Sequence, residues 1–390
     1  MSGAPPPGSP PGPPPDPPLR GLKVLELARI LAGPWAGQLL ADLGATVVKV
    51  EAPEGDDTRR WGPPFVEREG ERAAAYFHAC NRGKRGMVAD FATEEGRSLV
   101  RSLAAEADVV VENFKVGGLD RWGLGWDALS ALNPRLVWCS VTGFGQDGPY
   151  AGRAGYDFII QGMGGLMSVT GEPGGEPQKV GVAVVDLFTG VYAATAILAA
   201  LRQRDGTGRG QRVDMALLDV AVAMTANQAM NYLASGVPPA RMGNAHPNIV
   251  PYQVFPCRDG HAIVAVGNDA QHRRFCALLG APELAEPPHD TNPGRLAHRA
   301  HLVGRLAALT AARTRADLLA ACEAAGVPAG PINDLADAFA DPQVGARGMR
   351  VEPGGVPGVR APVRFSSSPL ALDLPAPRLG EHQGRASPWD

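Results

Sequence analysis

The chain has 390 residues, 45% of them hydrophobic and 20% charged, which is typical of a soluble globular protein with a core large enough for more than one domain. Its formal net charge of -3 provides no overall basic field that would draw it to nucleic acid or to a membrane surface. The five cysteines are far apart and form no C-x-x-C pair, which argues against a zinc site or a disulfide framework and favours a reducing cytoplasm.

Four segments differ in composition. Residues 1–18, MSGAPPPGSPPGPPPDPP, are rich in proline and lack apolar periodicity, so we expect a disordered or polyproline-like tail that is no signal peptide. Residues 19–235 predict a large α/β domain, and residues 236–330 predict a smaller α+β domain with its linkers. Residues 331–390 are rich in loops and too short for a domain, so we expect them to pack back on the large domain.

Strands alternate with helices in the first part of the chain, from Gly21 to Tyr150. This alternation predicts a parallel, doubly wound, Rossmann-like sheet. The predicted strands are Leu22–Leu27, Thr46–Glu51, Asp108–Asn113 and Leu136–Val141, and the predicted helices are Trp35–Leu43 and one from Thr93, as its cap, to Ala107.

Later elements are predicted mainly as helices. We expect helices over Met215–Leu233, Gln271–Leu279, Arg295–Ala312 and Arg315–Ala325, and strands over His261–Val266 and Val363–Phe365.

One apolar run, Val180–Leu201, carries a single charge, Asp186. Its length would suit a membrane span, since about 20 apolar residues cross a bilayer. However, an aspartate near the middle would cost roughly 2.5–3.5 kcal/mol, and no second span offers it a partner. We therefore interpret the run as a soluble element: a short extended segment, Gly181–Val185, followed by a helix, Leu187–Arg204.

Asp186 is then expected at the N-cap of this helix, where its oxygens accept free backbone N–H groups. The plain interpretation is a cap. The sharper one is a nucleophile, because a carboxylate held ionised by helix amides but set among apolar neighbours is poorly hydrated and more reactive. The two roles are compatible.

Several motifs are absent from the sequence. The turn after the first strand reads LAGPWAG and not G-x-G-x-x-G, although the unit ends in an acidic residue, Glu51, so we expect no NAD. The sequence also lacks a P-loop, a G-x-S-x-G elbow and an H-E-x-x-H pair, so we expect no metal site. His298 and His301 are taken as surface residues.

A set of short motifs follows in a fixed order through nearly all of the chain after the tail. The motifs are Gly21–Glu26, Ala32-Gly33-Pro34, Leu43-Gly44-Ala45, Val48–Glu51, Gly55–Arg59, Asn81–Arg85, Asp108–Phe114, Leu119–Arg121, Gly155–Asp157, the Asp186 segment, Gly206–Gln211, Gly326–Pro331 and Leu379–His382. In this order they resemble the class III CoA-transferase family, also called CaiB/BaiF, which includes formyl-CoA transferases, succinyl-CoA-dependent dicarboxylate CoA-transferases and α-methylacyl-CoA racemases.

The resemblance implies a covalent reaction on Asp186, which matches the position of the family's nucleophilic aspartate. It implies an acyl-CoA and a carboxylic acid as substrates, and a homodimer of interlocked chains. It also implies that CoA binds at Leu31, Ala32, Ala89, Asp90, Asn113, Phe114, Lys115, Arg121 and Tyr156.

Three arginines have two interpretations each. Arg121 is the best phosphate partner, or else a surface arginine. Arg59 and Arg60 bind a substrate carboxylate, or else belong to a solvated loop.

Two departures from the family pattern narrow the activity. The racemase branch has an acid/base histidine where this chain has Tyr156, so a transferase is favoured over a racemase. The glycine quartet of the formyl-CoA branch is absent, so the chain is more similar to the branch that handles dicarboxylic acids with succinyl-CoA. A CoA-binding scaffold that acts through the proline-rich tail is the non-enzymatic alternative.

Overall fold

The structure, a computed structural model, describes residues 15–389. The predicted tail therefore lies outside the described residues up to position 14. Residues 15–166, 180–229 and 345–389 form one compact unit, and residues 167–179 and 230–344 form a second. The domain limits inferred from the sequence, 19–235 and 236–330, stay a prediction.

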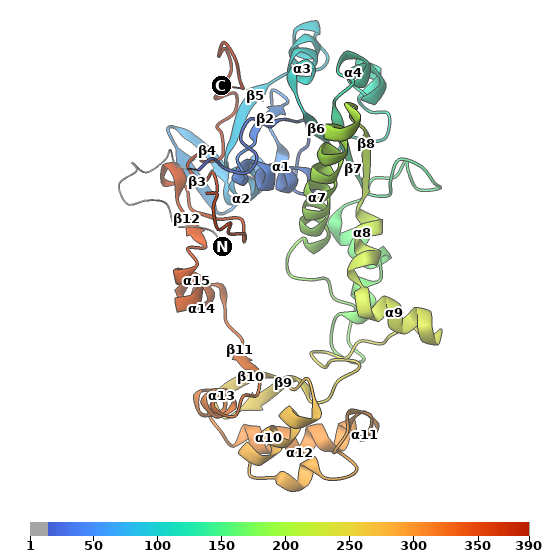
Figure 1. Ribbon diagram of the computed structural model, residues 1–390, viewed down its shortest axis with the longest axis vertical. Coiled ribbons are helices and arrows are strands. Elements are labelled where there is room, and N and C mark those ends of the chain that lie inside the picture. The colour runs from blue at the N-terminus through green and yellow to red at the C-terminus, as the bar shows by residue number, and fades with distance from the viewer. Residues whose placement is uncertain (1–14, 390) are drawn as a thin grey trace, which may run out of the picture. The chain divides into compact units, whose positions relative to one another are not determined.

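A six-stranded parallel sheet is the centre of the first unit, in the order β5-β2-β1-β6-β7-β8 (Figure 1). This confirms the predicted α/β class. The order reverses between β1 and β6, which is the switch point where open α/β sheets bind ligands. The strands are β1 (Lys23–Glu26), β2 (Thr46–Glu51), β5 (Lys84–Val88), β6 (Val109–Glu112), β7 (Val137–Thr142) and β8 (Arg212–Ala216).

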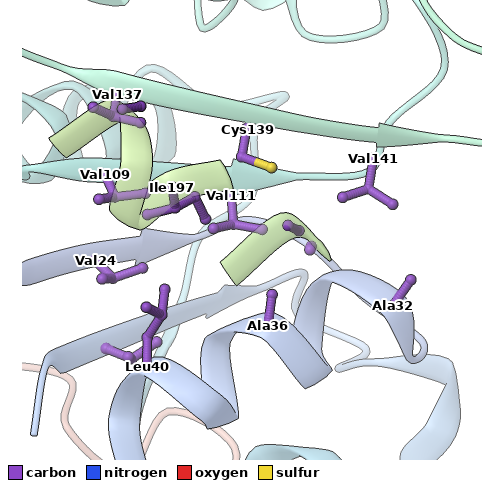
Figure 2. Close-up of a cluster of buried hydrophobic side chains, with 14 of the residues drawn as sticks. Val24, Ala32, Ala36, Leu40, Val109, Val111, Val137, Cys139, Val141 and Ile197 are labelled. Carbon is purple, nitrogen blue, oxygen red and sulfur yellow. The ribbon is translucent and has the colours of Figure 1, made fainter. Parts of the chain in front are cut away.

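Helices cover both faces of this sheet. On one face, α1 (Ala32–Asp42) and α7 (Val184–Thr207) pack on side chains that include Val109 and Val111 of β6 (Figure 2). On the other face, α3 (Glu94–Glu106) and α4 (Trp126–Leu132) share a core with Val110. Successive strand residues point to opposite faces, and valine suits both, so the buried strands read as continuous apolar runs.

Shorter elements complete the first unit. They are the hairpin β3 (Phe65–Arg68) and β4 (Glu71–Ala74), the helices α2 (Ala75–Asn81), α5 (Asp157–Met163) and α8 (Leu217–Met224), the 3-10 turns Asp57–Arg60, Asp120–Trp122 and Pro353–Gly355, and the pair β12 (Arg350–Val351) and β13 (Gly358–Val359). The helices α6 (Leu166–Val169) and α15 (Pro342–Ala346) contain residues of both units.

The second unit is built on an antiparallel sheet of three strands in the order β11-β10-β9. Its core contains Phe255, Phe275, Leu302 and Leu306. The elements are β9 (Tyr252–Cys257), β10 (Gly260–Ala265), β11 (Ala329–Pro331), α10 (Asp269–Leu278), α11 (Asn292–Ala297), α12 (Arg299–Ala311), α13 (Arg315–Ala324), α14 (Leu335–Ala340) and the 3-10 turn Pro282–Ala285, while α9 (Ala226–Ser235) joins the two units.

Three local predictions are wrong. The helix expected over Met215–Leu233 begins as the end of strand β8 and continues as two helices, α8 and α9, because Met215 pairs with Val141 of β7. Val363–Phe365 is not a strand. The extended segment expected at Gly181–Val185 is a bend that leads into α7, which already begins at Val184.

Among the described residues, one helix, α7, is long and apolar enough to cross a membrane. However, residues all along it, from Val185 to Arg204, are buried in the first unit. Burial of one face against a sheet is what a core helix of a folded domain requires.

A close crossing of α1 and α7 depends on Gly190. A Cβ atom at this position would lie 2.8 Å from the carbonyl oxygen of Ala32 and 2.8 Å from Cδ1 of Trp35. Neither the helix backbone nor the half-buried tryptophan can move far, so only glycine fits.

We expect Gly190→Ala to lower the free energy of unfolding by about 1–3 kcal/mol, because the added methyl forces the two helices apart. Gly206→Ala in the same helix is the matched control, since a Cβ there meets nothing within 4 Å, and it should be neutral or stabilise by up to about 1 kcal/mol. Urea unfolding of both variants measures the difference, and equal midpoints would contradict the crossing.

Candidate active site

A cavity of about 700 Å³ lies at the carboxyl ends of the parallel strands of the first unit. This is the edge at which α/β sheets bind ligands. Its walls come from the segments that follow β1, β2, β5, β6 and β7, together with the loop before α5 and the start of α7. The lining includes residues 27–32, 49–56, 89–92, 113–116, 141–143 and 153–156, as well as Gly118, Arg121, Trp122, Ala151, Asp186 and Leu217.

Most of the site residues predicted from the sequence meet in this cavity, although their chemical roles stay predictions. Those that line it are Leu31, Ala32, Ala89, Asp90, Asn113, Phe114, Lys115, Arg121, Tyr156 and Asp186. Arg59 and Arg60 do not line it.

Arg59 lies in a buried ion-pair network. Its guanidinium donates to both carboxylate oxygens of Glu51 at 2.6 and 2.8 Å and to Glu71 at 2.7 Å. Its charged face also lies 3.7 Å from the centre of the Phe77 ring. Arg60 is exposed and donates to Asp57 and to the carbonyl of Glu54. Both arginines are therefore engaged with other groups of the protein, and their contact with a substrate carboxylate stays a prediction.

Asp186 is the third residue of α7 and does not cap it, so the predicted N-cap is wrong. Ala183 holds the cap position, and the capping oxygen comes from Asp157 in α5. Oδ1 of Asp157 accepts hydrogen bonds from the backbone N–H groups of Val185 at 2.8 Å and Asp186 at 3.2 Å. A carboxylate from a neighbouring element thus does what the helix's own cap residue cannot.

Asp157 is itself held in place by Gln161, one turn further along α5. The Nε2 of Gln161 donates to Oδ2 of Asp157 at 2.6 Å, and its Oε1 accepts from the backbone N–H of Val180 at 2.9 Å. The two side chains therefore fasten both the start of α7 and the segment that precedes it. With Asp157 buried, this arrangement holds the backbone at Asp186.

Burial, and secondly the charge of Asp157, raise the pKa of Asp186 to about 7. The sequence had suggested that helix amides keep this carboxyl ionised, and the direction is the opposite, because poor hydration and a like charge both disfavour the ionised form. A half-buried carboxyl that titrates near neutral pH is a candidate for chemistry.

The loop between β1 and α1 forms one wall of the cavity and is fastened from two sides. Asn113 accepts from the backbone N–H of Arg29 at 3.0 Å and donates to its carbonyl at 2.7 Å. The backbone N–H of Ile30 donates to the carboxylate of Asp56 at 3.2 Å. The side-chain amide of Asn113 is thus hydrogen-bonded to the protein backbone, which the sequence did not indicate.

Four exposed cationic side chains line the cavity, in addition to the buried Lys49. Lys115 and Arg121 were predicted from the sequence, and Arg29 and Arg153 were not. The guanidinium of Arg121 lies 4.9 Å from the ring centre of Trp122, and that of Arg153 lies 3.9 Å from Tyr150. The position of Arg29 just after a parallel strand was the signal that could have found it. Together these cations suit a polyanionic ligand.

Tyr76 in α2 is a second neighbour of Asp186 that the sequence did not indicate. Burial, followed by the charges of Asp186, Cys80, Asp157 and Asp56, raises the pKa of Tyr76 to about 12. Its ring packs edge-on against Trp61 with the ring centres 5.3 Å apart. The phenol of Tyr76 therefore stays protonated at neutral pH.

Known proteins are similar to this chain along almost its whole length. The model of the family described as CoA-transferase family III matches residues 19–383. A succinate–glutarate CoA-transferase of Agrobacterium fabrum is 58% identical over 376 residues, covering 94% of each chain. A succinyl-CoA:glutarate CoA-transferase of Homo sapiens is 41% identical, and the match covers 93% of this chain and 84% of that protein. The crystal structure of a CaiB/BaiF family protein from Brucella suis matches with a TM-score of 0.87 and 62% identity, covering 94% of this chain and 97% of that one.

We expect Asp157→Asn to lower the pKa of Asp186 from about 7, because asparagine keeps an oxygen for the helix amides and removes the like charge. Since the native pKa is raised, the carboxylate of Asp186 forms as pH rises through about 7, and in the variant it should form at lower pH. A ¹³C NMR titration of the Asp186 carboxyl measures this. Asp127→Asn, an exposed site on α4, is the control, and an unchanged titration in Asp157→Asn would refute the coupling.

Proposed function

Because the chain belongs to CoA-transferase family III, we propose that it moves CoA from succinyl-CoA to a second dicarboxylic acid such as glutarate, through a covalent intermediate on Asp186. The observation that carries this proposal is the position of Asp186. It is a half-buried carboxyl at the start of a helix, in a cavity lined with cations.

The carboxylate of Asp186 attacks the thioester carbonyl of the acyl-CoA. The C–S bond breaks, CoA leaves as the thiolate, and an aspartyl–acyl anhydride remains. The thiolate then attacks the aspartyl carbonyl of the anhydride, which releases the first acid and leaves an aspartyl–CoA thioester. The acceptor carboxylate enters by the same two steps in reverse order, and Asp186 is regenerated without net proton transfer.

Poor hydration of Asp186 supports this route in two ways. It makes the carboxylate a stronger nucleophile, and it excludes the water that would hydrolyse the anhydride. The start of α1 provides electrostatic support, because Ala32 lies at the crossing with α7 one turn after Asp186. The first N–H groups of a helix have no partner within it, so they are suited to hydrogen-bond the oxyanion that forms at the attacked carbonyl.

CoA has phosphate groups, a flat adenine and a long pantetheine arm. We assign its phosphates to Lys115 and Arg121, which are both exposed at the cavity. The remaining predicted contacts, Leu31, Ala32, Ala89, Asp90, Asn113, Phe114 and Tyr156, offer backbone groups and apolar or aromatic surface along the walls. CoA acts here as substrate and is regenerated in each cycle.

The choice of dicarboxylic acids follows from the relatives. The similar proteins of Agrobacterium fabrum and Homo sapiens are named for succinate or succinyl-CoA and glutarate, and one of Haloarcula hispanica for succinyl-CoA and mesaconate. The racemase alternative has less support, because no histidine is among the described residues that line the cavity. A scaffold without turnover would not account for a cavity carboxyl, Asp186, whose pKa is raised to about 7.

We further propose that the protein is a cytoplasmic homodimer. Apolar side chains that are 45–57% exposed gather on α5, α7 and α8 of the first unit, which contact one another. They include Phe158, Ile159, Val191, Tyr192 and Val222. Exposed apolar surface of this kind marks a protein interface, and a second copy of the chain is the partner the family resemblance implies. The described cysteines are all buried and free, as suits a reducing compartment.

Incubation with succinyl-CoA and hydroxylamine should convert Asp186 to a hydroxamate that mass spectrometry locates, and glutarate should yield glutaryl-CoA. Asp186→Ala should reduce transfer by about a thousandfold or more, because the nucleophile is lost. Asp205→Asn, an exposed acid at the other end of α7, is the control and should keep full activity. Full CoA transfer by Asp186→Ala would refute the covalent mechanism.

Light scattering after size exclusion should give the mass of two chains for the wild type. We expect Val191→Glu to yield single chains or weaker dimers, because a buried unpaired charge at an interface is strongly unfavourable. Arg202→Glu on an exposed part of the same helix should leave the dimer intact. A wild type that elutes as a single chain at micromolar concentration would overturn the proposed assembly.

A further inference from the structure

Four charged side chains lie buried beneath the loop between β1 and α1. Glu26, Lys49, Asp56 and Lys84 are each no more than 3% exposed. Two carry positive charge and two carry negative charge, so the cluster is balanced. Buried charges are expensive to keep unless they are paired, and buried pairs do not by themselves make a protein more stable than apolar residues would. Stability alone therefore does not explain why these four charges are buried together.

Lys49 is the centre of the cluster. Its Nζ lies 3.2 Å from Oε1 of Glu26 and 3.0 Å from Oδ2 of Asp56, and it donates to the carbonyl of Ala28 at 2.8 Å. One ammonium group thus connects two strands to the first residues of the loop.

Asp56 is the next link and holds the loop itself. Its carboxylate accepts from the backbone N–H of Ile30, at 3.2 Å to the nearer oxygen, and from Thr58 at 3.0 Å through the backbone and 2.8 Å through the hydroxyl. Ile30 has a φ of +72°, in the left-handed region. A β-branched residue avoids this region unless its surroundings impose it.

The conformation at Ile30 decides where α1 begins. Leu31 is the N-cap of α1 and Ala32 its first residue. The carbonyl of Ala32 lies at the crossing with Gly190, which is one helical turn after Asp186. A change of φ at Ile30 would therefore turn the start of α1 away from Asp186.

We propose that the Lys49–Asp56 ion pair is a positioning device for the transfer reaction: it holds Ile30 in the left-handed conformation and so fixes the loop and the start of α1 against Asp186. This inference rests on the proposed function. Lys49 and Asp56 border the cavity, but their charged groups are engaged with each other and with the protein backbone, so they act through Ile30 as positioning residues.

Both groups stay charged at neutral pH. Burial works to lower the pKa of Lys49, but the carboxylates of Asp56, Glu26 and Glu51 outweigh it and raise the pKa. For Asp56, burial works to raise the pKa, and Lys49 together with the hydrogen bonds from Thr58 lowers it. The ion pair therefore persists throughout the pH range in which Asp186 titrates.

The test uses the full-length protein with succinyl-CoA and glutarate. Asp56→Asn should lower kcat by about tenfold to a hundredfold, since a displacement of about 1 Å in an active site has an effect of this size. Adding Ile30→Gly to Asp56→Asn should restore at least about half of the lost factor on a logarithmic scale, because glycine adopts a positive φ without being held there. Lys49→Met should behave like Asp56→Asn.

The matched control is Asp42→Asn. Asp42 is also buried and paired, with Arg82, but it lies at the far end of α1 and outside the cavity. Asp42→Asn should lower the melting temperature and leave kcat of the folded enzyme unchanged. If Lys49→Met does not fold, Asp56→Asn remains the decisive variant.

Two outcomes would overturn the proposal: a normal kcat in folded Asp56→Asn, or a reduced kcat that Ile30→Gly does not rescue. The hydroxamate at Asp186 separates this failure from that of the proposed function. If Asp186 is labelled in the wild type and at an equal rate in Asp56→Asn, only the positioning role is refuted. If Asp186 is not labelled in the wild type, the covalent mechanism itself is refuted.

Discussion

The contact between α1 and α7 at Gly190 is the constraint on which the site depends. Because no side chain fits between the two helices there, their backbones approach to within van der Waals distance. Gly190 lies one turn after Asp186, so this contact also fixes where the helix backbone that carries Asp186 lies. The sheet itself supplies the cavity, since the parallel strands end together beside the point where their order reverses.

Charged side chains are placed on both sides of this contact. Asp157 caps α7 from a neighbouring helix, and in doing so it places a negative charge beside Asp186 that adds to the effect of burial on its pKa. The same carboxylate therefore orders the helix and delays ionisation of the residue we propose as nucleophile. On the other side, the cluster around Lys49 pairs two basic with two acidic side chains and holds the backbone of the loop.

Much of the fold could be predicted because its signals are local. Valine-rich runs such as Val109–Glu112 alternate with amphipathic helices, and this alternation was enough to indicate a parallel sheet. The prediction was wrong where partners decide the structure. Met215 looked helical among its apolar neighbours, but it pairs with Val141 at the edge of the sheet, and Val363–Phe365 has apolar residues but forms no strand.

The sequence by itself determined the α/β class, the strand ends that supply the cavity walls, and Asp186 as the lone charge of an apolar run, because these depend on residue type, periodicity and order along the chain. Only the tertiary structure decided which charges meet. It placed Arg59 in an ion pair with Glu51 and away from the cavity, brought Asp157 to the start of α7, and brought Asp56 to Ile30. The physical reason is that a pKa and an ion pair depend on distance and burial, which join residues far apart in the chain.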